Sequence, residues 1–147
     1  MSDAASPSAT DLLDQANACH DDDVPRGAAL LRAIDAAALP VARQPLYAFL
    51  LNHVLGEKLG AWAEALGLHQ RLLVLPEPAA VLWRQAGAAA LALGDATMAQ
   101  QTAAAYAAAN GVDTARALDV LQLSAATYQV PGRDAETAAR VDRKSVV

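Results

Sequence analysis

The stretch that decides the fold is residues 80–113, AVLWRQAGAAALALGDATMAQQTAAAYAAANGVD. Alanine and leucine dominate it, and this mixture favours helices over strands by intrinsic propensity. Gly94 and Asp95 interrupt the stretch in its middle, and Asn110 and Gly111 close it, as expected for a turn and a helix C-terminus. The stretch therefore predicts two helices joined by a tight turn.

The same helical spacing of apolar residues continues in both directions from this pair. Further helices are expected over residues 10–19, 25–39, 45–59, 61–75 and 114–128. Their predicted start signals are Ser8 or Thr10 as a cap, Pro25 and Pro45 in first turns, and Asp113 or Thr114 as a cap. Their predicted stops are the acidic run at 21–23, Pro40, Gly60, Pro76 and Pro131.

No segment of this sequence alternates apolar and polar residues with the period of two that a half-buried strand requires. The sequence therefore predicts an all-α fold of antiparallel helix pairs. A disordered lead-in is expected at residues 1–9, a single helical domain at 10–130, and a tail or short helix at 131–147. A length of 147 residues is usual for one domain.

An internal repeat underlies these pairs. Gly60 recurs as Gly94 and Ala65 recurs as Ala99, each 34 residues later. Helix pairs repeated at this spacing stack on one another, because a single pair cannot bury its apolar face. Small residues such as Gly87 and Ala99 let helix backbones approach closely. We therefore expect Gly87→Leu to overpack the core, and Trp83 to supply much of the local burial.

These residues resemble the tetratricopeptide repeat (TPR) family. The family's early Trp falls on Trp83, its Leu-Gly on Ala86 and Gly87, its turn Gly on Gly94 and its next small residue on Ala99. The resemblance covers roughly residues 10–113 as about three degenerate repeats. It implies a short right-handed solenoid in which the first helices line a concave groove and a C-terminal helix caps the stack.

In this geometry the non-core positions of the first helices would face a partner. These positions are Tyr47, Leu50, Val54, Lys58, Arg84, Ala88 and Leu91. Such a groove would suit a peptide segment of another protein with apolar anchors and an acidic group. The alternative is that the apolar members pack against the protein's own helices.

The charge balance bears on the partner class. Eleven Lys and Arg face sixteen Asp and Glu, giving a net charge of -5, which opposes binding to nucleic acid or to an anionic membrane. The N-terminus lacks a secretory signal pattern, and no apolar run reaches the roughly 20 residues that span a bilayer. With a single cysteine, Cys19, no internal disulfide forms, so we expect a cytoplasmic protein.

Residue types that carry chemistry are sparse and scattered. Cys19, His20, His53 and His69 lack the paired short spacings of a zinc site, and the acidic run at 21–23 is typical of a solvated loop. The few serines and dispersed glycines form neither a nucleophile motif nor a phosphate loop. The sequence therefore predicts no metal site, no cofactor and no enzyme activity.

The function predicted from the sequence is a non-catalytic protein interaction module, an adaptor or chaperone. Two alternatives remain open. Small acidic proteins with three such repeats resemble the translocator chaperones of bacterial type III secretion, and the alanine-rich composition is typical of a GC-rich genome. In the other alternative, the helix at 114–128 builds a homodimer through Leu121 and Tyr128.

Overall fold

The computed structural model describes residues 7–128, and every regular element in this range is helical. The α-helices are α1 (Ala9–Cys19), α2 (Val24–Ala33), α3 (Gln44–Leu50), α4 (Trp62–Leu73), α5 (Ala80–Leu93), α6 (Ala96–Asn110) and α7 (Thr114–Ala126). Two 3₁₀ turns, η1 (Ala36–Ala38) and η2 (Val41–Arg43), join α2 to α3, and a π-helix, η3 (Leu51–Lys58), extends α3. The predicted all-α class is confirmed for the described residues. Residues 1–6 of the predicted lead-in and the whole predicted tail at 131–147 lie outside them.

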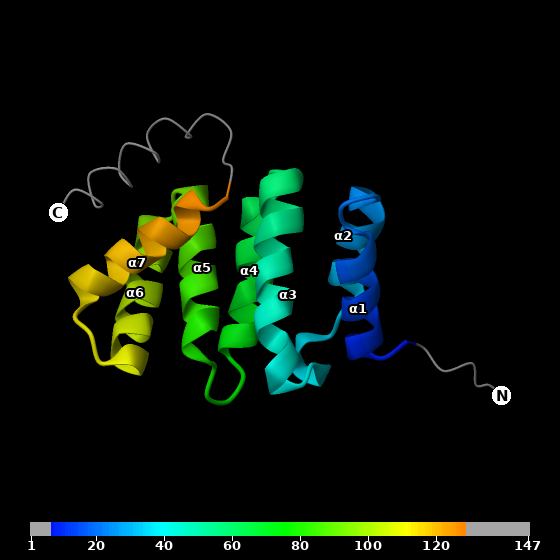
Figure 1. The fold of residues 1–147 in the computed structure, drawn as a ribbon. Coiled ribbons are helices and arrows are strands. Elements are labelled where there is room, and N and C mark those ends of the chain that lie inside the picture. The colour runs from blue at the N-terminus through cyan, green and yellow to red at the C-terminus, as the bar shows by residue number, and fades with distance from the viewer. Residues whose placement is uncertain (1–6, 129–147) are drawn as a thin grey trace.

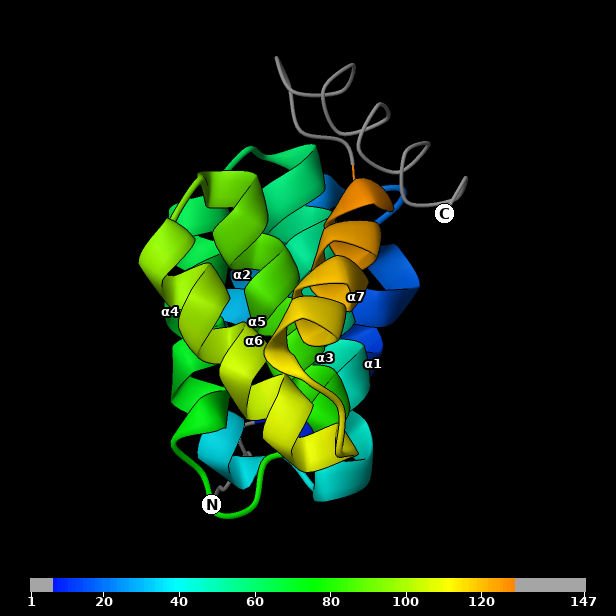
Figure 2. The same ribbon diagram turned by 90° about the vertical axis from the view of Figure 1, so that its left-hand side faces the viewer.

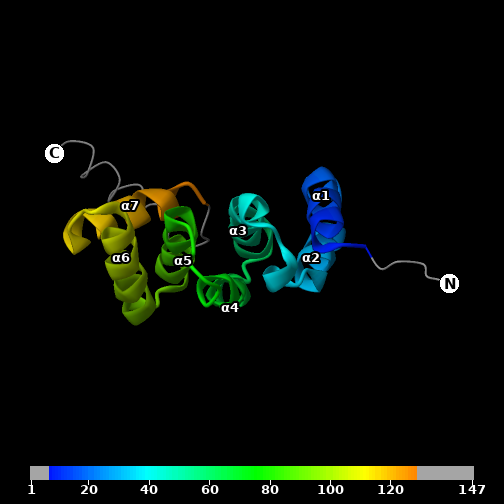
Figure 3. The same ribbon diagram turned by 90° about the horizontal axis from the view of Figure 1, so that it is seen from below.

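Helices that follow one another in the sequence lie side by side. Figure 1 shows α1 to α6 standing roughly upright next to one another, with α7 inclined across α5 and α6. Figure 2 shows the same crossing of α7 from the side. Seen from below, α1, α3 and α5 occupy one side of the molecule, while α2 and α4 occupy the other (Figure 3).

Acidic and hydroxyl side chains fix the helix starts. Ser8 accepts a hydrogen bond from the Asp11 N–H, and the Asp11 carboxylate accepts one from the Ser8 N–H, so α1 begins with a capping box. Asp23, Asp95 and Asp113 cap α2, α6 and α7 by accepting bonds from backbone N–H groups three residues later. These caps confirm the predicted starts of α1 and α7.

Glycines at positive φ form the corners between helices. Gly60 ends the α3–η3 helix at φ 69°, and Gly94 ends α5 at φ 87°, so the two glycines of the repeat occupy equivalent corners. Gly111 forms a third corner between α6 and α7. A side chain with a Cβ rarely adopts this left-handed conformation, so these positions favour glycine.

The predicted helix at 25–39 is too long. α2 ends at Ala33, and Ile34 is extended. The carboxylate of Asp35 accepts a hydrogen bond from the Ala37 N–H and starts the 3₁₀ turn η1 instead. A side chain that bonds the nearby backbone offers it an alternative to the helix, which is why the helix ends before Pro40 is reached.

The first helix of the second pair widens into the π-helix η3. Beyond its end, the Leu59 N–H donates to the carbonyl of Val54, five residues earlier, at 3.2 Å. π-Helical segments are rare in proteins and are mostly single turns within α-helices. Because each turn contains an extra residue, the spacing of three and four residues does not mark one face of this segment.

Two kinds of core hold the helices together. From α1 to the start of α5, a cluster rich in leucine and including Tyr47 fills the space between helices. Around α5, α6 and α7 the buried residues are mostly alanines, with Trp62, Leu66, Leu121 and Tyr128 as the large members. Trp83 is half-buried and is not among the residues of these clusters.

Gly87 lies where α5 meets α6 and α7. A Cβ added there would overlap the Leu121 side chain and would lie 2.9 Å from Thr102 Oγ1. No larger residue fits without a shift of α7 or of the Leu121 side chain. The close approach predicted at Gly87 is therefore present, and the buried aromatic role expected of Trp83 is taken by Trp62 instead.

Candidate functional site

Most of the predicted partner-binding residues lie in the core. Tyr47, Leu50, Val54 and Ala88 have at most 1% of their surface exposed. Their expected exposure on a groove is wrong, because the protein's own helices cover them. The assignment followed the geometry that the TPR resemblance implies, and the α-helical spacing which that geometry requires does not hold across η3, where Val54 lies.

The three remaining predicted partner-binding residues lie in different parts of the fold. Lys58 is exposed at the end of η3, and Leu91 is half-buried against the alanine-rich clusters of α5 to α7. Arg84 lines a pocket. The fold thus does not bring Lys58, Leu91 and Arg84 together into one groove, and only Arg84 keeps its expected position beside a cavity.

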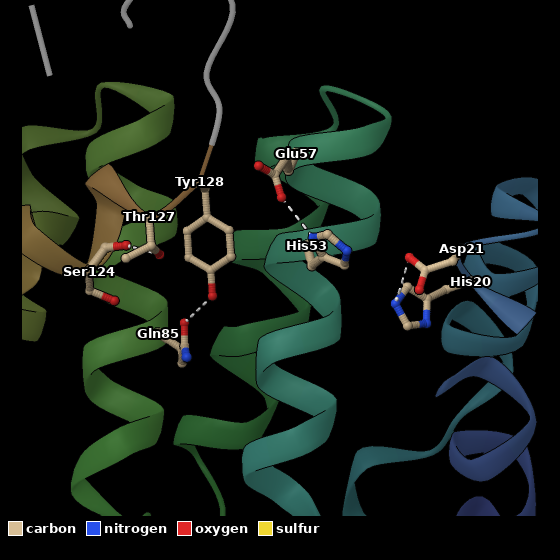
Figure 4. Close-up of polar contacts among 8 residues, drawn as sticks. All are labelled: His20, Asp21, His53, Glu57, Gln85, Ser124, Thr127 and Tyr128. Carbon is tan, nitrogen blue, oxygen red and sulfur yellow. Dashed lines mark hydrogen bonds and ion pairs between the residues drawn. The ribbon is translucent and has the colours of Figure 1, made fainter. Parts of the chain in front are cut away.

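This pocket lies between α3, α5 and α7 and has a volume of about 420 Å³. We call it the α3/α5/α7 pocket. Its lining residues are Phe49, Arg84, Gln85, Val120, Leu123, Ser124, Thr127 and Tyr128. Figure 4 shows Tyr128 between α5 and α3, with its hydroxyl directed at Gln85.

The lining of the pocket combines apolar area with one cation. Phe49 and Leu123 are 40% and 43% exposed, so both offer apolar surface to a ligand. The Nε atom of Arg84 is buried and has no hydrogen-bond partner. A buried donor without a partner carries a desolvation cost, which a ligand oxygen placed within reach would offset.

A buried polar network lies directly behind the pocket. The Asn52 amide donates to the backbone carbonyl and to the side-chain oxygen of Gln85, each at 3.0 Å. The Tyr128 hydroxyl donates to the same Gln85 Oε1 at 2.9 Å. His69 Nε2 lies 2.8 Å from Asn52 Oδ1. The network thereby connects η3, α4 and α5 to Tyr128, two residues beyond the end of α7.

The network fixes the protonation of His69. Because the Asn52 amide nitrogen donates to Gln85, its oxygen must accept from His69, which places the ring proton on Nε2. The Nδ1 atom is buried without a partner. Burial lowers the pKa of His69 to about 3, so this ring is neutral in the fold. Burial also raises the pKa values of Tyr47, to about 12, and of Tyr128.

The residues proposed for a homodimer are also buried. Leu121 is fully covered, and Tyr128 is 6% exposed and packs edge-on to Trp62 with ring centroids 5.8 Å apart. They hold α7 against the rest of the molecule. The exposed apolar residue of α7 is Leu123, which lies in the α3/α5/α7 pocket.

Sequence reasoning missed Phe49 and Leu123 as pocket residues. A signal was present for Leu123, because it falls outside the apolar series Leu118, Leu121, Ala125 that marks the buried face of α7. Phe49, on α3, is not among the partner-binding residues expected from the sequence. The pocket that it lines is formed together with α5 and α7, an arrangement that linear spacing does not reveal.

Within residues 7–128, no helix combines the length and the hydropathy needed to cross a lipid bilayer. Comparison of the sequence and fold with models of known protein families, with curated proteins and with solved structures gave no match.

Proposed function

We propose that this protein is a non-catalytic interaction module, a short TPR-like stack of helix pairs that binds a peptide segment of another protein. The α3/α5/α7 pocket is the binding site in this proposal. The observation that carries it is the position of Arg84, whose buried Nε has no partner, in the wall of a largely apolar cavity.

The chemistry of the pocket specifies the kind of segment. An apolar side chain of the partner would cover Phe49 and Leu123, and apolar anchors in pockets supply most of the affinity of protein interfaces. A carboxylate next to that side chain would pair with Arg84, since a guanidinium and a carboxylate form strong charge-assisted hydrogen bonds. The expected ligand is therefore an acidic residue, or the terminal carboxylate of a polypeptide, beside a large apolar residue.

A selection of short peptides from a random display library on the immobilised full-length protein tests this proposal. We expect the enriched peptides to share an apolar residue next to a carboxylate. Fluorescence anisotropy with an enriched peptide should show at least tenfold weaker binding to Arg84→Gln and to Leu123→Asp. These changes remove the cation and the apolar wall, respectively, without touching a fully buried side chain.

Val74→Asp is the matched control for Leu123→Asp. Val74 is 82% exposed and lies outside the α3/α5/α7 pocket, so the same kind of charge there should leave peptide affinity unchanged. Circular dichroism melts establish that each variant is folded. Enriched peptides without any carboxylate, or equal affinity for the parent and for folded Arg84→Gln, would contradict the proposal.

A further inference from the structure

Three metal-ligating side chains from distant parts of the sequence meet at one edge of the fold. His20 and Asp21 follow α1, and His53 lies in η3, yet one ligand atom from each lies within 4.8 Å of the other two. The two imidazole rings pack edge-on with centroids 5.3 Å apart. His20 Nε2 is 3.3 Å from Asp21 Oδ1. The sequence predicted no metal site because these histidines are far apart along the polypeptide.

The outer contacts of both histidines determine which nitrogen is available. His20 Nδ1 lies 2.8 Å from the backbone carbonyl of Asn17, which can only accept, so this nitrogen carries the proton. His53 Nδ1 lies 2.7 Å from Glu57 Oε1 and donates to that carboxylate. In the neutral rings the Nε2 atoms therefore hold the lone pairs.

This arrangement is the one that metal-binding histidines generally have. A ligating imidazole usually donates its other N–H to a carboxylate or to a backbone carbonyl, which fixes the tautomer and the orientation of the ring. Here His53 uses a carboxylate and His20 a carbonyl. Figure 4 shows the edge of the His53 ring opposite Glu57 turned toward His20 and Asp21.

We propose that His20, Asp21 and His53 bind a divalent transition-metal ion, with Zn²⁺ as the best fit. Two imidazoles and one carboxylate are ligands that suit zinc, and three protein ligands leave a fourth tetrahedral position for water or a ligand. Hard cations such as Ca²⁺ require more oxygen donors than this cluster contains.

Only small movements are needed to close the site. Ligands at zinc distances in a tetrahedron lie about 3.3 Å apart, compared with the present spread of up to 4.8 Å. Asp21 is 74% exposed on a turn, so its side chain is free to reorient. The side chains of His20 and His53 are only 12% and 22% exposed, so their rings are already held in place.

A bound metal would connect two parts of the fold that are distant in the sequence. It would tie the turn between α1 and α2 to η3. His53 also stacks on Phe49, with ring centroids 5.4 Å apart and planes 17° from parallel. The metal would therefore also restrict a residue that lines the α3/α5/α7 pocket, although the site does not depend on a partner there.

Metal titration of the chelator-stripped full-length protein tests the proposal. Calorimetry with ZnCl₂ should give one equivalent bound, and CoCl₂ should give the visible absorption bands of tetrahedral cobalt. His20→Gln and His53→Gln should each weaken zinc binding by at least about 100-fold. Glu57→Ala, which removes only the outer contact of His53, should weaken it by about 10- to 100-fold.

Two neighbouring substitutions act as controls. Asp22→Asn removes a carboxylate adjacent to the cluster, and Cys19→Ser removes the nearby thiol, and both should leave affinity and stoichiometry unchanged. If His53→Gln fails to fold, the zinc affinity of His20→Gln alone tests the proposal. His20 lies at the C-terminal end of α1, outside the buried core clusters, so this variant should remain folded. Absence of zinc binding to the parent protein, or unchanged affinity in a folded histidine variant, or loss of binding in Cys19→Ser would overturn the proposal.

Discussion

The two halves of the described structure are packed in different ways. Between α1 and α4, large side chains such as Leu13, Leu31 and Leu72 fill the core and are fully buried. Between α5 and α7, the buried positions are mainly alanines, and Gly87 lets Leu121 press against the α5 backbone. In the first half, large side chains fill the space between the helices. In the second half, small side chains let α5 and α7 approach each other closely at Gly87.

This difference implies opposite weaknesses. A core filled by large side chains is damaged when a side chain is shortened, because a cavity remains. A core built by close approach is damaged when a side chain is enlarged, because there is no space for it. Asn52, His69, Gln85 and Tyr128 form the polar seam between the two halves, which adds a sensitivity to pH.

The largest effect is expected from truncation in the leucine-rich half. Leu50 is fully buried, so Leu50→Ala should lower the free energy of unfolding by about 2–5 kcal/mol. Leu123→Ala, at a residue 43% exposed, should change it by about 0.5 kcal/mol or less. Urea denaturation measures both. Similar decreases in the free energy of unfolding of the two variants would contradict the full burial of Leu50.

Acidification is expected to weaken the seam. His69 has a pKa of about 3 in the fold and of about 6.5 when unfolded, so between about pH 3 and pH 6.5 it is mainly the unfolded state that binds this proton. Stability from this residue is complete above pH 6.5 and falls by roughly 2–3 kcal/mol by about pH 4.5. Denaturation across this range, in chelator, compares the parent with His69→Gln. An equally steep loss in the variant would assign the pH dependence to other groups.

Replacement of a glycine by alanine should lower the free energy of unfolding in the second half and raise it in the first half. Gly87→Ala should cost about 1–3 kcal/mol, because the new methyl group collides with Leu121. Gly67, in α4, has nothing within 4 Å of the position of an added Cβ, so Gly67→Ala should stabilise by about 1 kcal/mol through helix propensity. Thermal melts give both signs. Stabilisation by Gly87→Ala would disprove the close approach of α5 and α7.

The smallest effect concerns a surface ion pair between α2 and α4. Arg32 donates to Glu64 through Nε at 2.7 Å and through Nη2 at 2.8 Å, and the pair lowers the pKa of Glu64 and raises that of Arg32. Both side chains are well exposed, so a double-mutant cycle with Arg32→Ala and Glu64→Ala should give a coupling of about 0.5–1 kcal/mol. The coupling should decrease in high salt, and a salt-independent value would contradict a surface ion pair.

Local sequence signals determined the helices and their corners. Ser8, Asp95 and Asp113 act on backbone groups within three residues of themselves, and Gly60 and Gly94 act through their own φ angles. Such interactions need no distant partner, so the pattern of residues is sufficient to predict them. The end of α2 was missed because Asp35 begins a competing turn.

The tertiary structure alone decided which surfaces are exposed and which side chains meet. The geometry implied by the TPR resemblance placed Tyr47, Leu50 and Val54 on a groove, but the protein's own helices bury them. His20 and His53 come together although 33 residues separate them. Burial and proximity depend on how one helix lies against another, and that arrangement is the sum of many contacts, none of which is written in the spacing of a single helix.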